Sequence, residues 1–170
     1  MYIQIKNLYT FVHTNLVTTN MKIEDIIKST VTLSSAKRAV LNVMFADMIV
    51  TDHFNDILKP FDLSPEQYNV LRILRGQKGK PANMCTIQER MIAKTSNTTR
   101  LVDKLLLKEL VTREICPDNR RKMEVEITQK GLDVLAEIDP KAVEHENYFA
   151  EKLTSEELEL FNNLLEKYRS

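Results

Sequence analysis

The chain has 170 residues, which corresponds to about one domain and is long enough to bury a core without disulfides or a metal. Apolar residues make up 43% and charged residues 28%, which excludes collagen-like, low-complexity and globally disordered classes. Three glycines are too few for the turns of a β-sandwich, and no apolar stretch approaches the roughly 20 residues of a membrane span. With only two cysteines and no signal-like N-terminus, the sequence predicts a cytoplasmic protein.

The charge is unevenly distributed, although basic and acidic residues balance at 24 each. Residues 72–130 hold 14 basic and 7 acidic side chains, a net charge of +7, whereas residues 1–71 carry −1 and residues 131–170 carry −6. A basic middle between neutral and acidic ends favours a polyanion-binding module with flanks that do not bind. A solvated basic face without a partner is the other interpretation of the charge alone.

The N-terminal third contains an extension followed by a long helix. Residues 1–34 form an N-terminal extension of unsettled status, because Met21 is a plausible start in its own right and the sequence does not decide whether the first 20 residues are translated. Apolar residues at helical spacing predict one helix over 35–58, which Pro60 ends.

Three further helices are predicted in the middle of the chain. The Ser-Pro-Glu-Gln run at 64–67 is a capping box that begins a helix ending at Gly76. A short helix follows over 84–92. After a tight turn, another helix begins near Thr95 or Ser96 and ends near Glu109, with leucines on one side and basic residues on another.

The apolar pattern then changes from a period near 3.6 to a period near 2. Apolar and polar residues mostly alternate over 111–116 and again over 123–127, which predicts two short strands. The segment 117–122 between them contains a turn followed by three successive cations. These residues are therefore expected to form a β-hairpin with a basic tip.

Two helices are predicted at the C-terminal end. Thr128 caps the first, which continues past Pro140 with an expected kink, and a capping box at 154–157 begins the last. The helices at both chain ends have more apolar surface than the small middle can cover, which favours packing against a second copy. We therefore expect 35–60 and 131–170 to form a dimerisation region around a lobe over 61–130.

The order helix, helix, turn, helix, strand, hairpin, strand is typical of a winged helix-turn-helix, so the predicted fold is mainly α (α+β). In such a unit the N-terminal turn of the second helix of the pair enters the major groove, and basic residues in the wing reach the backbone or the minor groove. Short polar side chains and cations occupy these positions. The candidate DNA-binding residues are Thr95, Ser96, Asn97, Thr98, Thr99, Arg100 and Lys104 in the helix and Asn119, Arg120, Arg121 and Lys122 in the wing.

Each of these assignments has a purely structural alternative. The polar residues before the helix could be caps, and Arg100 could pair with Asp103 or with the wing instead of with DNA. One of the two wing arginines, Arg120 or Arg121, could form an internal salt bridge.

The run from Ile92 to Gly131 closely resembles the MarR family of winged helix-turn-helix transcription regulators. The similarity spans about 35–170 and is weakest over 1–34. It rests on T-R-L-V-D-K-L at 99–105, L-V-x-R-E at 110–114, D-N-R-R at 118–121, I-T-x-K-G at 127–131 and, upstream, L-S-P-E-Q-Y-x-V-L at 63–71.

The resemblance implies a homodimer whose two recognition helices bind successive major grooves of a pseudo-palindromic operator. It also implies a repressor, often relieved by a small aromatic or phenolic ligand bound between the dimerisation region and the DNA-binding lobe. Two residues depart from the family pattern: Asn119 stands where the family often has an aspartate before the wing arginines, and Glu109 stands where the recognition helix usually ends in glycine. A left-handed cap at Glu109 would cost about 1 kcal/mol.

Candidates for a ligand pocket are aromatic residues and a histidine, with packing in the core as the alternative for the aromatics; they are Phe45, His53, Phe54, Phe61 and Tyr68. Cys85 and Cys116 are expected to be packed side chains. The histidines are too dispersed to predict a metal site, and no cofactor is expected.

Catalytic motifs are lacking in the sequence, so an enzyme is not expected. The sequence does not distinguish a repressor from an activator. The other functional hypothesis is a winged-helix module for protein–protein contact without specific DNA binding.

Overall fold

The computed structural model describes residues 21–94, 97–116 and 123–170. The chain divides into two compact units, residues 1–48 and 49–170, and the boundary falls inside helix α3 (Ser35–Leu58). The described part of the first unit contains the short helix α2 (Ile23–Ile26) and the beginning of α3. Ile23 and Leu33 are its buried apolar residues.

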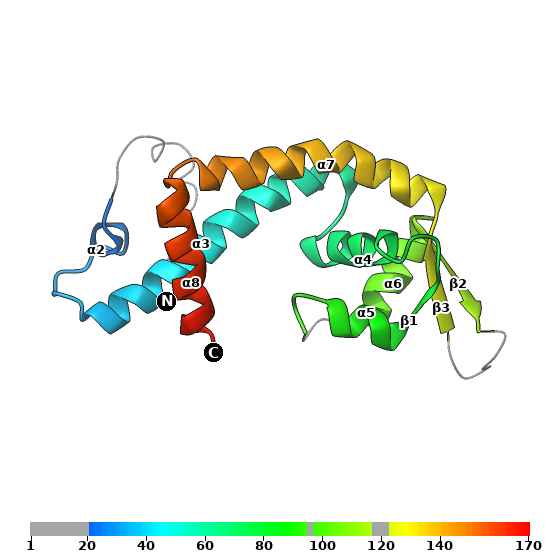
Figure 1. Cartoon of the computed structure of the whole chain (residues 1–170), viewed down its shortest axis with the longest axis horizontal. Coiled ribbons are helices and arrows are strands. Elements are labelled where there is room, and N and C mark those ends of the chain that lie inside the picture. Colours follow the sequence, from blue (N-terminus) through cyan, green and yellow to red (C-terminus); the bar gives the residue numbers. More distant parts are fainter. Residues whose placement is uncertain (1–20, 95–96, 117–122) are drawn as a thin grey trace. The chain divides into compact units, whose positions relative to one another are not determined.

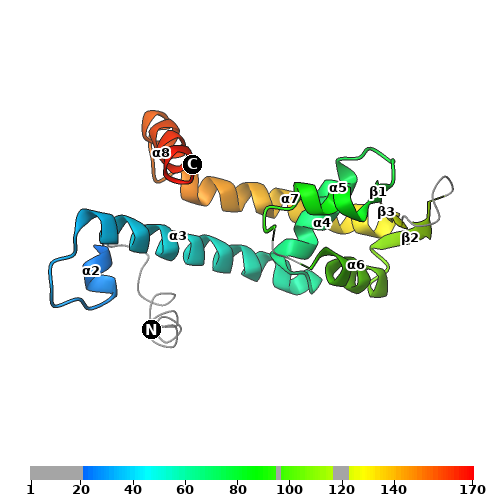
Figure 2. The same ribbon diagram turned by 90° about the horizontal axis from the view of Figure 1, so that it is seen from below.

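The second unit contains the end of α3, further helices and a small antiparallel sheet (Figures 1 and 2). This mainly helical fold with a winged helix-turn-helix order confirms the predicted fold class. Its elements after α3 are η1 (Lys59–Phe61), α4 (Pro65–Arg75), β1 (Ala82–Asn83), α5 (Met84–Arg90), α6 (Thr98–Leu107), β2 (Val111–Ile115), β3 (Met123–Ile127), α7 (Gln129–Ala150) and α8 (Ser155–Tyr168).

Side-chain caps begin these helices where the sequence predicts them. At α4 the Ser64 hydroxyl accepts the Gln67 backbone N–H and the Gln67 side chain accepts the Ser64 N–H, at 3.3 and 3.0 Å. The same reciprocal pair joins Thr154 and Glu157 at the start of α8. Thr128 caps α7, and this helix continues through Pro140 without interruption.

The sheet has the order β1-β3-β2, with both pairings antiparallel. Val111 lies opposite Ile127 and Ile115 opposite Met123, so β2 and β3 form the predicted hairpin. The two-residue strand β1 is an addition that alternation cannot reveal in so short a segment. It pairs Ala82 with Val125 and thereby attaches the segment before α5 to the sheet.

One apolar core joins the helices of the lobe to the sheet and to α7. Residues of α7 that are three and four apart point inward, as a helix with one apolar stripe requires. The inward stripe of α7 consists of Gly131, Leu135, Ile138, Ala142 and His145. The fully buried residues of this core on other elements include Leu58, Leu71, Ile87, Val102, Leu105 and Val125.

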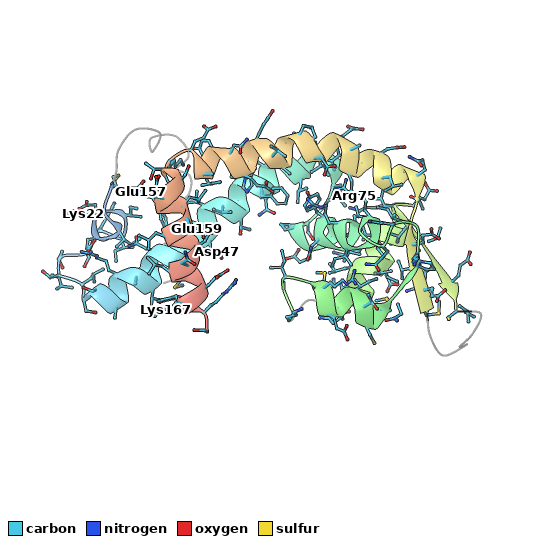
Figure 3. The ribbon with its side chains drawn as sticks, in the orientation of Figure 1. Lys22, Asp47, Arg75, Glu157, Glu159 and Lys167 are labelled. Carbon is cyan, nitrogen blue, oxygen red and sulfur yellow. The ribbon has the colours of Figure 1, made fainter. Side chains whose placement is uncertain are left out.

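A bidentate ion pair also joins α4 to α7. The Arg75 guanidinium donates to both carboxylate oxygens of Asp139, at 2.6 and 3.0 Å. Figure 3 shows Arg75 between the two helices. The hydrogen bond from Arg75 holds the pKa of Asp139 below its ordinary value, although burial opposes this shift.

Non-glycine residues occupy left-handed positions at helix ends, including the end of the recognition helix. Glu109 has φ of 60°, and the Leu110 N–H donates to the Leu105 carbonyl at 3.0 Å. This is the Schellman arrangement. The Glu109 carboxylate pairs with Lys130 at 3.0 Å, and its carbonyl accepts the Thr128 hydroxyl at 2.8 Å. Glu109 thus adopts the left-handed conformation that glycine usually provides at the end of a helix.

Gly131 is required by a close backbone approach. A Cβ at this position would lie 2.3 Å from the Leu110 carbonyl oxygen and 2.8 Å from an Ile127 side-chain carbon. The carbonyl oxygen belongs to backbone held between the end of α6 and β2, so it cannot move aside as a flexible side chain can. The first turn of α7 therefore packs directly against the start of the wing.

Gly131→Ala is expected to destabilise the protein by about 2–3 kcal/mol, since the added methyl overpacks a site bounded by backbone. Urea unfolding followed by circular dichroism measures the change. Gly76→Ala is the control: its Cβ would approach backbone oxygens no closer than 3.3 Å, and the expected change is under about 1 kcal/mol. Equal stability of the two variants would contradict the close approach at Gly131.

Candidate nucleic-acid interface

Helix α6 is the second helix of the helix-turn-helix, and its N-terminus is set by a side-chain cap. The Asn97 side-chain oxygen accepts the Arg100 backbone N–H at 3.1 Å. Asn97, a predicted DNA contact, is exposed and also has this structural role. The helix begins later than the position near Thr95 that periodicity suggests.

Two adjacent threonines at this terminus differ in exposure. Thr98 is only 5% exposed, and its hydroxyl donates to the side-chain oxygen of Gln88 on α5. Thr98 therefore connects the two helices of the motif, and the prediction that it contacts DNA is corrected, because α6 packs against the core through this residue. Thr99 and Arg100, the next two predicted contacts, are exposed.

The turn between α5 and α6 is held by two side-chain amides that sequence reasoning missed. Gln88 donates to the Lys94 carbonyl at 2.6 Å, in addition to accepting from Thr98. Asn69 of α4 accepts the Ile92 backbone N–H at 3.1 Å. Neither amide belongs to a recognisable pattern in the sequence, because each acts on backbone that only the fold brings near.

The recognition helix is also joined to the wing. The Arg113 guanidinium on β2 donates to the Asp103 carboxylate on α6 at 2.6 Å. Asp103, which the sequence left open as a partner for Arg100, is thus paired with Arg113. The exposed side of α6 presents Thr99, Arg100 and Lys104, while Val102 and Leu105 are buried.

The other predicted DNA-binding residues lie outside the described part of the chain. They are Thr95 and Ser96 before α6 and Asn119, Arg120, Arg121 and Lys122 at the wing tip. The strands that lead to that tip are described as far as the pair Ile115 and Met123.

The residues predicted to line a ligand pocket are instead packed together or separated. Phe54 lies edge-on to Tyr68 with ring centroids 5.1 Å apart, and His53 contacts His145. Phe61 lies under the Lys141 ammonium, which is 4.8 Å from its ring centroid. Phe45 belongs to the first unit.

A groove of about 660 Å³ lies close to these aromatics but is lined by other residues. Lys104 of the recognition helix lines it, so this predicted DNA contact also faces the groove. The Lys108 ammonium pairs with Asp62 at 2.9 Å, and this hydrogen bond and charge hold the pKa of Asp62 below its ordinary value. The lining residues are Asn55, Asp56, Lys59, Asp62, Leu63, Ser64, Gln67, Lys104, Leu107 and Lys108.

Two negative findings concern other kinds of site. Among the residues that the structure describes, no group of three histidine, cysteine or carboxylate side chains could hold a metal ion. Within the same residues, no helix is long and apolar enough to cross a membrane.

Cys116 is buried as expected, whereas Cys85 is exposed.

Thr98→Val and Thr99→Val form a matched pair that tests the orientation of α6. Thr98→Val should lower the free energy of unfolding by about 1–2 kcal/mol, because Gln88 loses its donor in a part-buried site. Thr99→Val should leave stability within about 0.5 kcal/mol of the original, because its side chain is exposed. Thermal or urea unfolding measures both, and a larger loss for Thr99→Val would contradict the orientation.

Comparisons with known proteins agree with this architecture. The model of the MarR family matches residues 63–123. The HTH-type transcriptional regulator MhqR of Bacillus subtilis (strain 168) is 29% identical over 118 residues, which cover 69% of this chain and 80% of the relative.

Two solved structures extend the similarity to most of the chain. A MarR transcription factor from Planctomyces limnophilus has 29% identity and a TM-score of 0.62, covering 80% of this chain and 98% of that one. The BpsR regulator of Bordetella bronchiseptica, whose DNA binding is regulated by 6-hydroxynicotinic acid, shares the fold at 18% identity with a TM-score of 0.71, covering 82% and 99%. Residues 63–123 thus match the MarR family of winged helix-turn-helix transcription regulators, and most of the chain shares the fold of MarR regulators of known structure.

Proposed function

We propose that this regulator is a homodimeric repressor that binds a pseudo-palindromic operator through α6 and the wing. The observation that carries the proposal is the exposed side of α6. Thr99, Arg100 and Lys104 lie on that side, while the Thr98 hydrogen bond joins the helix to α5 and the Asp103–Arg113 pair joins it to β2. Hydroxyl and cationic side chains at the start of a recognition helix are suited to phosphates and base edges.

The charge distribution supports a polyanionic partner. Residues 72–130, which include the recognition helix and the wing, carry a net charge of +7. Phosphate contacts by such a segment release counterions, so affinity for DNA should fall steeply as salt is added. An acidic protein partner would also be attracted by this charge. In that case, however, the chain itself would show no preference for one DNA sequence.

The dimer proposal rests on α8. No residue of this 14-residue helix is buried within the part of the chain that the structure describes. An amphipathic helix of this length is marginal unless its apolar face is covered. The capping box indicates that the helix is formed, and we propose that its apolar face packs against a second copy of the chain. The exposed apolar residues of that face and of the turn before it are Leu153, Leu160, Phe161, Leu164 and Tyr168.

We also propose that a small aromatic or phenolic effector relieves repression, and we place its site in the groove beside α6. Lys59 and Lys104 would attract an acidic ligand, and Leu63 and Leu107 offer apolar contact. A ligand there would touch the recognition helix directly through Lys104. The regulation of BpsR by 6-hydroxynicotinic acid is consistent with an effector of this chemistry. Adding aromatic acids to the DNA complex tests for release.

Binding to the DNA just upstream of the protein's own gene, titrated with salt and compared with scrambled DNA, tests the main proposal. Specific binding that falls steeply with log[salt] is expected. Arg100→Ala should weaken binding and reduce the slope by about 1, and Arg120→Ala with Arg121→Ala should weaken binding to all DNA. Arg169→Ala removes the same charge at the end of α8 and should change neither. Equal, weak binding to both DNAs would favour the protein-contact function.

The dimer is tested by Leu164→Glu, which places a charge on the apolar face of α8. Sedimentation or light scattering should show a monomer or an aggregate, with little DNA affinity remaining, because burying an unpaired carboxylate is costly. Asn162→Glu adds the same charge on the opposite side of α8 and should remain dimeric. A dimeric, tightly binding Leu164→Glu variant would contradict the assignment of this face.

A further inference from the structure

A histidine pair lies where the end of α3 meets α7, apart from the surface assigned to DNA. Nδ1 of His53 and Nδ1 of His145 are 2.8 Å apart. At this distance one Nδ1 must donate a hydrogen and the other must accept it with its lone pair. The contact therefore requires the Nδ1–H tautomer in one ring and the Nε2–H tautomer in the other.

Both rings lie among aromatic side chains. His53 stacks on Tyr148 with centroids 5.0 Å apart and planes inclined by 1°. His145 lies 5.1 Å from Phe54, and Phe149 is edge-on to both histidines at 5.7 and 5.2 Å. These rings solvate a positive charge less well than water does, so they favour the neutral pair.

His145 occupies a core position. It is 9% exposed and continues the inward stripe of α7, where aliphatic residues fill the preceding positions. A leucine there would pack without titrating. A histidine at this position, facing a second histidine, makes the contact between the two helices depend on protonation.

Charged groups near the pair come from α3, α4, α7 and the turn after α7. Glu146 of α7 favours protonation of His145, and a charge on His53 opposes it. The Lys152 ammonium lies 4.0 Å from the centroid of the Tyr148 ring that stacks on His53. Asp52 and Asp56 lie on α3 with His53, while α4 contributes Tyr68, which accepts a hydrogen bond from Arg72.

The direction of the pH effect follows from these surroundings. Burial lowers the pKa of His145, and His53 lowers it further, against the opposing effect of Glu146. The unfolded chain, with histidine pKa values near about 6.5, therefore binds protons more readily than the folded one. Stability contributed by the neutral pair is present above about pH 6.5 and is lost as the pH falls through the folded-state pKa.

We propose that the His53–His145 pair is a proton-operated latch, which holds the end of α3 against α7 at neutral pH and releases it in mild acid. A first proton places a charge among aromatic rings. A second would direct two N–H donors at each other across 2.8 Å, so the contact cannot persist. Because α3 leads into the DNA-binding lobe and α7 leads out of it, release would lower DNA affinity; this last step rests on the proposed function.

Thermal unfolding of the full chain between pH 8 and pH 5.5 tests the latch. The unfolding constant of the unmodified protein should rise about tenfold for each pH unit between the unfolded and folded pKa values. His145→Phe keeps an aromatic ring without titration and should lose most of this dependence. His53→Phe leaves His145 buried and should lose only the smaller part that His53 contributes. His13→Gln, which removes the third histidine, should keep it. An unchanged pH dependence in both phenylalanine variants would overturn the proposal.

Nitrogen-15 NMR of the imidazoles in the unmodified protein decides the question even if a variant fails to fold. The expected result is one Nδ1–H ring and one Nε2–H ring at pH 8, with His145 titrating below about 6.5. The same tautomer in both rings, or two independent titrations at the ordinary value, would refute the latch.

Operator affinity at pH 7.5 and pH 5.8 tests the coupling to DNA. The unmodified protein should lose affinity in acid by a larger factor than His145→Phe does. Equal losses in the two proteins would overturn the coupling. If the protein binds no DNA at either pH, the proposed function fails, and the latch is judged by its unfolding and NMR results alone.

Discussion

The presentation of the recognition helix depends on one part-buried hydrogen bond, between the Thr98 hydroxyl and the Gln88 side chain. A helix lying on an apolar core through Val102 and Leu105 keeps that face inward, but burial has no direction and sets the rotation of the helix only coarsely. A hydrogen bond does have a direction. By pairing Thr98 with α5, it sets more closely the rotation at which α6 presents Thr99, Arg100 and Lys104.

The same arrangement recurs around the helix, with polar groups fixing positions that apolar burial leaves free. Asn97 caps its first turn, Asp103 holds the wing strand through Arg113, and Glu109 ends the helix. Each bond taken singly is of modest strength, on the order of 1 kcal/mol. Together they constrain the start, the middle and the end of a ten-residue helix. The polar side chains of the motif are therefore divided between holding the helix and facing outward.

Local signals predicted the elements well. The capping box of Ser64 and Gln67, the Thr128 cap and the alternation in β2 and β3 depend only on neighbouring residues, and the structure contains all of them. The strand β1 was missed because two residues carry no period, and its pairing with β3 arises from the fold.

The inward orientation of Thr98 was missed for a similar reason. The sequence places it in a polar run from Asn97 to Arg100, and nothing local distinguishes it from Thr99. Only the packing of α5 against α6 decides which of the two hydroxyls is buried. The groove beside Lys104 was likewise hidden, since its lining comes from four separate elements, whereas Phe54 and Tyr68, two of the residues predicted to line a ligand pocket, pack against each other.

The left-handed residues at helix ends have a consequence for the unfolded chain. Lys28, Asp62 and Glu109 occupy positions that glycine would adopt without strain, and each adds roughly 1 kcal/mol of backbone strain to the folded state. A side chain at the same position also narrows the range of conformations open to the denatured chain, which lowers the entropy gained on unfolding. A non-glycine residue at such a position therefore lowers stability through strain in the folded state and raises it through the lower entropy of the unfolded state. The helix ends of this regulator are defined by hydrogen bonds made despite local strain, and the disordered ensemble against which they compete is correspondingly smaller.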